Sequence, residues 1–338
     1  MTRRDVLPLD LCHVILSYSL TSRGIVAAIG TEAGEISLWT PSVHSPWEAH
    51  TMGCAQAHTG GVHCVDVDAV WGVLVTGGAD GQLSLYSSST RTRCSALMHK
   101  GEIYSVCFLK DGARRVASGA SDNLIVISSA IDLQKLCVIR EHHTDWIRVL
   151  QSFPATEQRH AFVSGSDDGL LCVWESTTGV LRQRIDTARH HKYVRCLSIR
   201  STVAVSCGNS TCVVIFAVTD IVLEIRSVVN LLAATTCVAL LSDATAAASC
   251  EDTSVIIVNI REGFPTRRLY GGHGRGWDTL CVSLVTLITH AYGTEEYVIT
   301  SGTDGAVVVW DLTDGSAALQ QLYPVSRAAI TAFCIKGL

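Results

Sequence analysis

Residues 162–174 read Phe-Val-Ser-Gly-Ser-Asp-Asp-Gly-Leu-Leu-Cys-Val-Trp, and this stretch predicts a tight β-hairpin. A short apolar strand ends at Ser164, Asp168 and Gly169 form the turn, and a second strand runs to Trp174. An aspartate at such a turn can accept a hydrogen bond from its own backbone, and glycine adopts the positive φ that a two-residue hairpin requires. The pattern therefore favours β-structure here.

The same unit recurs along the whole chain. The clearest copies are Thr76–Gly81 and Thr300–Gly305, each with a hydroxyl residue four positions before the aspartate and an aromatic residue six positions after it (Tyr86 and Trp310). The aligned turn positions are Ala33, Asp80, Asp122, Asp168, Ser210, Asp252 and Asp304. They lie 42 to 52 residues apart, so the chain holds seven units.

A histidine precedes most of these hairpins by about one strand. Examples are His58, His99, His143, His191 and His273. A period of roughly 40–45 residues with a histidine start and a Trp-Asp end is the WD40 signature, and the sequence resembles the WD40 family from end to end.

This resemblance implies an all-β, seven-bladed β-propeller formed by residues 1–338 as a single domain. A closed ring leaves no exposed strand edges, and we expect the two termini, Leu11–Ser19 and Ala328–Ile335, to share the closing blade. Which terminus supplies which strand stays open. The expected blades are 11–56, 57–97, 98–140, 141–188, 189–229, 230–270 and 271–338.

The residues support an all-β fold without the resemblance. Helical periodicity is absent over windows longer than about ten residues, and β-branched runs such as Val213-Val214-Ile215 dominate.

Charge and hydropathy limit the class of protein. A net charge of −5 and a pI of about 6.2 suit a cytoplasmic protein and argue against a surface devoted to nucleic acid. No uncharged apolar run reaches the ~18–20 residues of a membrane helix. Arg3 and Arg4 before an apolar stretch faintly resemble a signal peptide, but Asp5, Pro8 and Asp10 favour a strand.

The chain has fourteen cysteines and no C-x-x-C pair. Most lie in apolar strands, where a thiol acts as a small hydrophobe, so we expect reduced core cysteines. A zinc site or a disulfide framework is the alternative. We expect no metal and no cofactor.

Histidine, hydroxyl and aspartate side chains recur together and suggest nucleophilic catalysis at first sight. Their repetition favours a structural role, since an active site is normally single. In the WD40 family these positions form a hydrogen-bond relay, which implies relays built from His58, Thr76, Asp80, Tyr86, His143, Ser164, Asp168, Trp174, His273, Thr300, Asp304 and Trp310. We therefore expect no catalytic residues and no enzyme activity.

Two other motifs are weaker signals of a binding site. The run Gly271–Gly276 resembles a phosphate-binding loop, but it lacks the lysine-hydroxyl ending and no helix signal follows it. The pairs His142-His143 and His190-His191 could bind a metal, but neighbouring side chains on a strand point to opposite faces.

The strongest local concentration of positive charge is a basic run formed by Arg182, Arg184, Arg189, Lys192 and Arg195. It could be a solvated strand edge, or it could contact phosphates or an acidic partner.

Among WD40 proteins, the order of irregular blades resembles the receptor-for-activated-C-kinase family. The matching features include His143-Thr144-Asp145-Trp146, His191-Lys192-Tyr193-Val194 and a sixth unit without its histidine. This resemblance implies a non-enzymatic scaffold on the small ribosomal subunit that links translation to signalling. Its partners would be ribosomal proteins and rRNA, with no membrane, and the chain would be monomeric within a larger complex.

The chain departs from that family in its first turn. A basic pair is replaced by Thr31-Glu32-Ala33-Gly34, so ribosomal contacts would have to come from Arg3, Arg4, Lys100 or the basic run. The alternative is a WD40 subunit of another assembly, such as an RNA-modifying, trafficking or flagellar complex. An enzyme would instead need one convergent polar cluster.

Overall fold

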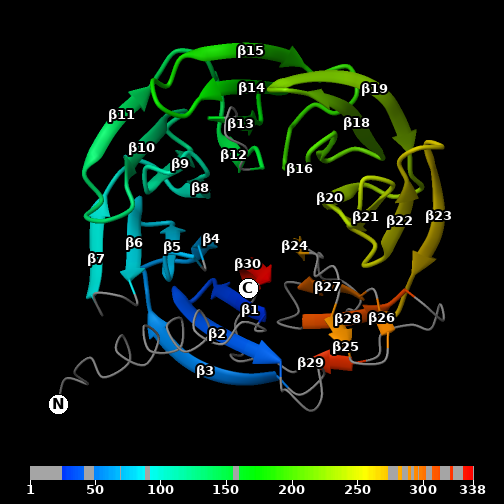
Figure 1. The fold of residues 1–338 in the computed structure, drawn as a ribbon, viewed down its shortest axis with the longest axis horizontal. Coiled ribbons are helices and arrows are strands. Elements are labelled where there is room, and N and C mark those ends of the chain that lie inside the picture. Colours follow the sequence, from blue (N-terminus) through cyan, green and yellow to red (C-terminus); the bar gives the residue numbers. More distant parts are fainter. Residues whose placement is uncertain are drawn as a thin grey trace.

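The computed structural model describes residues 25–41, 49–68, 70–87, 92–154 and 160–272, and further short strands between 281 and 337. All regular secondary structure in these described residues is β-strand, as the predicted all-β class requires. The strands form four-stranded antiparallel sheets that stand around a common centre (Figure 1).

Most sheets are built from four consecutive strands. In each, the first strand lies nearest the centre and the fourth lies outermost (Figure 1). These sheets are β4–β7 (Val62–Asp68, Val73–Gly78, Gln82–Ser87, Thr92–Leu97), β8–β11 (Ile103–Leu109, Arg115–Ala120, Ile125–Ser129, Lys135–Ile139), β12–β15 (Ile147–Ser152, Ala161–Ser166, Leu170–Glu175, Leu181–Asp186), β16–β19 (Cys196–Ile199, Val203–Cys207, Cys212–Thr219, Val222–Asn230) and β20–β23 (Thr235–Leu240, Thr245–Cys250, Val255–Asn259, Phe264–Leu269).

One sheet combines strands from opposite ends of the sequence. Its order is β3-β2-β1-β30, with β1 at Ile25–Thr31, β2 at Glu35–Pro41, β3 at Ala49–Gln56 and β30 at Ile330–Gly337. β30 pairs antiparallel with β1, from Ile25 opposite Gly337 to Thr31 opposite Ile330. The later segment of the chain thus supplies the inner strand of this sheet. The other expected closing segment, Leu11–Ser19, lies outside the described residues.

The remaining four-stranded sheet has the order β24-β27-β28-β29 (Cys281–Ser283, Tyr297–Ser301, Val307–Asp311, Gln320–Leu322). A hairpin of β25 (Ile288–His290) and β26 (Gly293–Glu295) is inserted between its first two strands. The expanded connection expected around His290 is therefore a small sheet of its own.

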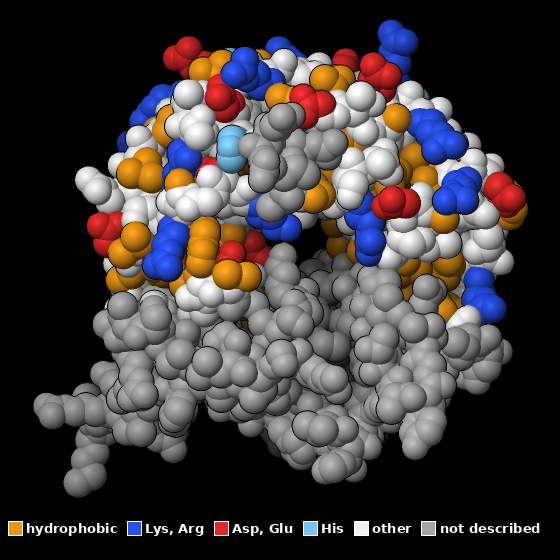
Figure 2. Space-filling model, in the orientation of Figure 1, with side chains coloured by type: hydrophobic (Ala, Val, Ile, Leu, Met, Phe, Trp, Pro, Cys, Tyr) orange, Lys and Arg blue, Asp and Glu red, His pale blue; other side chains and the backbone are white. Residues whose placement is uncertain are grey.

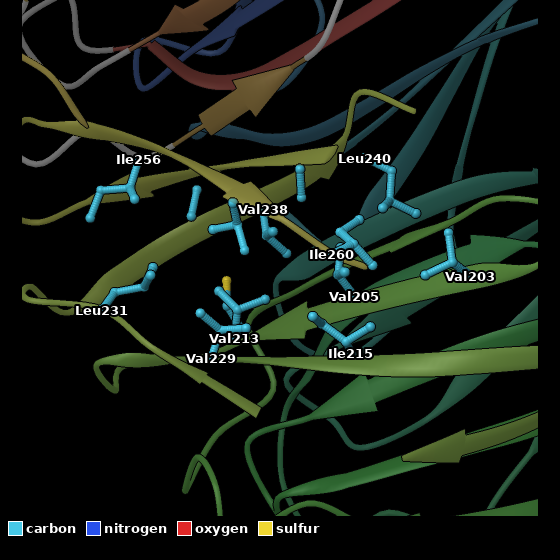
Figure 3. Packing of buried hydrophobic residues seen from close by; sticks show 14 of the residues in the cluster. Val203, Val205, Val213, Ile215, Val229, Leu231, Val238, Leu240, Ile256 and Ile260 are labelled. Carbon is cyan, nitrogen blue, oxygen red and sulfur yellow. The ribbon is translucent and has the colours of Figure 1, made fainter. Parts of the chain in front are cut away.

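The core lies between neighbouring sheets. Figure 3 shows one buried cluster, to which the β16–β19 sheet contributes Val205 and Ile215 and the β20–β23 sheet contributes Val238 and Ile256. Val205 and Ile215 are fully buried, and burying an aliphatic side chain of this size contributes about 1.5–3 kcal/mol. Each sheet needs its neighbours to cover its apolar faces.

A bulge recurs at the start of the inner strands. In β4, β8, β12 and β20 the register shifts across the second residue of the strand, which faces no single partner residue. The bulged residues are His63, Tyr104, Arg148 and Thr236. Bulges often redirect a side chain, so these positions become candidates for surface contacts.

Within the described residues, the structure contains no helix of the length and apolarity needed to cross a membrane.

Candidate functional site

In two of the predicted relays the histidine is hydrogen-bonded to both the aspartate and the hydroxyl residue. His143 Nδ1 lies 2.9 Å from Asp168 Oδ2, and its Nε2 lies 2.7 Å from Ser164 Oγ. Trp174 Nε1 donates to the same hydroxyl at 2.7 Å. In the β4–β7 sheet, His58 lies 2.9 Å from Asp80 and 2.8 Å from Thr76. Tyr86 is fully buried at the aromatic position of that sheet.

A third relay was missing from the predicted set. His99 Nδ1 lies 2.9 Å from Asp122 Oδ1, and Nε2 lies 2.8 Å from Ser118 Oγ. The spacing of these three residues could have identified it, since it closely matches the other two relays. Ser128 takes the place of the aromatic residue, and its buried hydroxyl has no hydrogen-bond partner.

The other units keep only parts of the relay. His191 Nε2 lies 3.3 Å from Ser206 Oγ, while its buried Nδ1 has no hydrogen-bond partner because Ser210 replaces the aspartate. Trp310 Nε1 donates to Thr300 Oγ1 at 2.9 Å. His273 and Asp304 lie outside the described residues.

The sixth unit, which has no opening histidine, uses its aspartate differently. Asp252 accepts hydrogen bonds from the backbone N–H and the hydroxyl of Ser254, and it pairs with Arg268. Here the turn aspartate is anchored by a residue of the outer strand β23 instead of by a histidine.

The relay electrostatics fix the protonation of its members. Burial opposes ionisation of Asp168, but the bond from His143 and the backbone N–H groups of Thr144 and Leu170 outweigh it and lower the pKa of the carboxyl. Burial lowers the pKa of His58 despite its contact with Asp80. In the His58 relay, the lowered pKa values of Asp80 and His58 favour a carboxylate beside a neutral histidine, whose Nε2 then accepts a hydrogen bond from the Thr76 hydroxyl.

The hydroxyls of the complete relays are inaccessible to a substrate. Thr76, Ser118 and Ser164 each have 0% of their surface exposed. A nucleophile must reach its substrate, and these three buried hydroxyls cannot, so a candidate interaction site has to be sought among other side chains.

The bulged residues supply such a site. His63 and Tyr104 have ring centroids 5.2 Å apart, and Tyr104 stacks on Trp146 at 5.5 Å. The Arg148 guanidinium lies over both rings, 4.2 Å from the Tyr104 centroid and 4.6 Å from that of Trp146. Side chains from three sheets thus meet near the first residues of the inner strands, which follow the relay histidines in the chain.

Two carboxylates fix this arrangement. Glu102 accepts a 2.8 Å hydrogen bond from the Tyr104 hydroxyl and lies 3.3 Å from His63 Nε2. Burial and this bond raise the pKa of Tyr104 to about 12. Asp167 accepts a 2.7 Å bond from Arg148 Nε and pairs with Arg195 Nε at 3.3 Å.

The array extends toward the next sheet and is partly open to solvent. Lys192 and Arg195 both lie over the Tyr193 ring, at 4.9 and 5.5 Å. Trp146 is 41% exposed, although it is anchored by its neighbours. We call this set the bulge cluster: His63, Glu102, Tyr104, Trp146, Arg148, Asp167, Tyr193 and Arg195. Tryptophan, tyrosine and arginine are the residues most enriched at binding hot spots.

The basic run does not form one patch. Arg182 and Arg184 are exposed on the outer strand β15, where Arg182 pairs with Glu175 at 2.6 Å. Arg195 belongs to the bulge cluster, whereas Arg189 and Lys192 are exposed in the connection between sheets. Figure 2 shows acidic and basic side chains interspersed over the described part of the visible face.

The remaining basic candidates differ in what the structure shows. Lys100 is exposed, and its backbone N–H donates to Asp122 at 3.0 Å. Arg3 and Arg4 lie outside the described residues. In the first turn, Glu32 is exposed and Gly34 has a φ of 82°, so an acidic residue occupies the place where the resemblance implies a basic pair.

The two pairs of adjacent histidines are not on strands, so the expectation that their side chains point to opposite faces of a strand was wrong. Both pairs lie in the connections before β12 and β16, not on strands. His143 is buried in its relay while His142 is exposed. In the described part of the chain, no three histidine, cysteine or acidic side chains are grouped so that they could hold a metal ion. Most of the loop at Gly271–Gly276 lies outside the described residues.

Comparison with known proteins agrees with this architecture. Residues 92–127 and 134–175 match the WD40 family, described as WD domain, G-beta repeat. The first match runs from the outer strand β7 into β10, and the second runs from the outer strand β11 through β14. A search of curated proteins found no match.

Proposed function

We propose that this chain, which contains WD40 repeats, is a non-enzymatic protein-interaction scaffold that binds partners through the bulge cluster. WD40-repeat proteins are typically non-catalytic scaffolds, and WD40 domains generally bind proteins. The proposal includes a closed seven-bladed propeller formed by residues 1–338 as one domain. The pairing of β1 with β30 and the contacts of β24 with both β20 and β30 support closure.

The observation that carries the proposal is an exposed aromatic side chain held in a fixed position. Trp146 is stacked on Tyr104 and covered by Arg148, whose guanidinium is in turn held by Asp167. A side chain that is already ordered loses little conformational entropy when a partner docks on it. Tyr104 and Arg148, which contact Trp146, lie on the inner strands β8 and β12.

The test measures partner capture by the tagged full chain. Trp146→Ala and Tyr104→Ala are expected to reduce at least tenfold the recovery of proteins that the unchanged chain retains. Tyr270→Ala is the matched control, because Tyr270 is 54% exposed and carries Arg268 over its ring at 4.9 Å, yet lies outside the cluster. Equal recovery by all three variants, with unchanged unfolding midpoints, would disprove a role for the cluster.

A finer proposal places the chain in the cytoplasm on the small ribosomal subunit, linking translation to signalling through contacts with ribosomal proteins and rRNA. Its support is the family resemblance together with the exposed Lys100, Arg184, Arg189 and Lys192. Against it stands Glu32 in the first turn. Another assembly, such as an RNA-modifying, trafficking or flagellar complex, is the competing proposal.

Sedimentation of cell lysate through a sucrose gradient separates these two proposals. Co-migration with small subunits and whole ribosomes, weakened at raised salt, is expected if phosphate contacts hold the chain on the ribosome. Sedimentation as a free monomer would contradict the ribosomal proposal and leave the interaction scaffold. Migration with a different large particle would favour another assembly.

A further inference from the structure

The residue after each bulge occupies a position where two neighbouring sheets meet. In successive inner strands this position holds Cys64, Ser105, Val149 and Cys237. In β16, whose pairing with β17 has no register shift, the matching residue is Cys196 at the start of the strand. The side chain reaches the inner strand of the next sheet: Cys64 Sγ lies 3.6 Å from the Ile103 carbonyl oxygen, and Cys196 Sγ lies 3.2 Å from that of Val238.

The β16–β19 sheet and the neighbouring β20–β23 sheet both have cysteine at this position. Cys196, on β16, and Cys237, on β20, have their sulfur atoms 3.0 Å apart. An S–S bond is about 2.05 Å long, so the two sulfur atoms would have to move about 1 Å closer to form one. Both residues are half-buried, and neither is in a disulfide.

We propose that Cys196 and Cys237 form a reversible intramolecular disulfide that fastens the β16–β19 sheet to the β20–β23 sheet when the protein meets a peroxide. One thiolate attacks a peroxide oxygen, the O–O bond breaks, and hydroxide leaves, which gives a sulfenic acid. The second thiolate attacks that sulfur, the S–S bond forms, and the S–O bond breaks. The two thiol protons convert the two hydroxides into water, and the peroxide has accepted both electrons.

A third thiol lies close enough to compete. Cys207 is directly opposite Cys196 in the β16–β17 pairing, but it is fully buried. Its contact with Cys196, together with burial, raises the pKa of the Cys196 thiol. Oxidation therefore proceeds slowly at neutral pH and faster as the pH rises, because the thiolate is the nucleophile.

The expected consequence is a cross-link between two sheets that otherwise meet only through packing and hydrogen bonds. The bond would close the loop between residues 196 and 237 and restrict the unfolded chain. A loop of that length in a chain of this size raises the unfolding midpoint by about 5 °C.

The experiment treats the reduced full chain with hydrogen peroxide, alkylates the remaining thiols, and maps the peptides without reduction. A peptide joining Cys196 to Cys237 is expected, and it should disappear in Cys196→Ser and in Cys237→Ser. Cys207→Ser should retain it. Cys64 is an internal control, since its counterpart in the next sheet is Ser105, and it should stay alkylated without an intramolecular link.

Each other result would overturn the proposal. A Cys196–Cys207 link would show that the pair within one sheet reacts first. Links only between separate chains, or full alkylation of both cysteines after peroxide treatment, would show that the short distance has no chemical consequence. Thermal unfolding gives a second readout: the midpoint of the unchanged chain should rise on oxidation, and that of Cys237→Ala should not.

Discussion

Each complete relay joins three strand or turn segments through one buried imidazole. His143 contacts Asp168 in a turn and Ser164 on β13, and the same hydroxyl accepts the indole N–H of Trp174 on β14. Removing the ring would leave a carboxylate and a hydroxyl without their shared partner in a buried site. The cost of such a loss exceeds that of a surface hydrogen bond.

His143→Ala is therefore expected to lower the free energy of unfolding by about 1–3 kcal/mol. His142→Ala is the matched control, because His142 is adjacent but exposed, and its contact is an edge approach to Trp174 at 5.1 Å. Urea denaturation of both variants gives the comparison. An equal loss in the two variants would contradict the supporting role of the relay.

The incomplete relay at His191 predicts a pH dependence. Burial, and secondarily the charge of His190, lower the pKa of His191 to about 4. Above about pH 6.5 the residue is neutral in both folded and unfolded chains, so it has no effect. Between pH 6.5 and 4 only the unfolded chain binds the proton, and stability falls by up to about 1.4 kcal/mol per pH unit.

His191→Gln should reduce the slope of the unfolding free energy against pH by the contribution of about one proton. The check is the free energy of unfolding measured at pH 7, 6 and 5, with His160→Gln as the exposed control. His58 and His63, whose pKa values burial also lowers, keep part of the slope in every variant. Identical slopes for the two variants would show that His191 is protonated in the folded chain.

At the scale of single residues, the sequence predicted the side chains that recur in each repeat but not the contacts made at the bulges. The relays of His58 and His143 were predictable because fixed spacing in a repeat implies equivalent positions. The Arg148 and Trp146 contacts were not, since a bulge shifts the side chain away from the period-2 alternation used to assign strand faces. Arg195, in the connection before β16, was assigned to a basic run from its charge alone, whereas its ion pair with Asp167 brings it into the bulge cluster.

At the scale of the elements, the tight turns connect one sheet to the next. The carbonyl of Gly81 accepts hydrogen bonds from the N–H groups of Met98 and His99, at the opening of the following unit. The carbonyls of Gly34 and Gly169 accept equivalent bonds at their own sheets. The turns at Gly34 and Gly81 thereby position the histidine that begins the next repeat. The turn at Gly169 positions Thr187, in the segment that leads to His191.

Replacing the turn glycine should disturb this connection. Gly81 has a φ of 71°, and an added Cβ would lie 2.6 Å from the His99 carbonyl oxygen. Gly263 has a φ of 74° but open space around it. The left-handed conformation costs a non-glycine residue about 1–2 kcal/mol, so Gly263→Ala should show that loss alone. Gly81→Ala should lose at least about 1 kcal/mol more through the clash.

Denaturation midpoints of the two variants test this difference directly. Equal losses would mean that the segment at His99 moves freely away from the turn. The hairpins themselves were predictable from Asp-Gly and its alternating flanks. The role of the turn carbonyl was not, because backbone acceptors carry no sequence signal.

For the whole molecule, the pairing of β1 with β30 is the only strand pairing that joins segments from opposite ends of the described chain. Truncation before residue 330 would remove the inner strand of that sheet and expose the β1 edge. We expect loss of cooperative thermal unfolding and concentration-dependent association, measured by calorimetry and light scattering. A chain with a short Gly-Ser extension after Leu338 should behave normally. A monomeric, cooperatively unfolding truncation would contradict this expectation.

The repeat period predicted a set of similar antiparallel sheets, because each unit is too small to bury its own apolar faces. It could not assign the shared sheet, since both terminal segments are apolar and either could pair with β1. The bulge cluster could not be predicted from the repeat period either. It depends on side chains from three sheets that meet only after those sheets have packed together.

The pairing of β1 with β30 also has a consequence in time. During translation, β1 leaves the ribosome long before β30, because about three hundred residues separate them. At about 5–20 residues per second, the edge of β1 stays without its final partner for roughly 15–60 s. Throughout that interval a nascent chain on a polysome can offer this edge to the same strand of a neighbouring nascent chain. Fast elongation or a chaperone that shields residues 25–31 would favour the monomer.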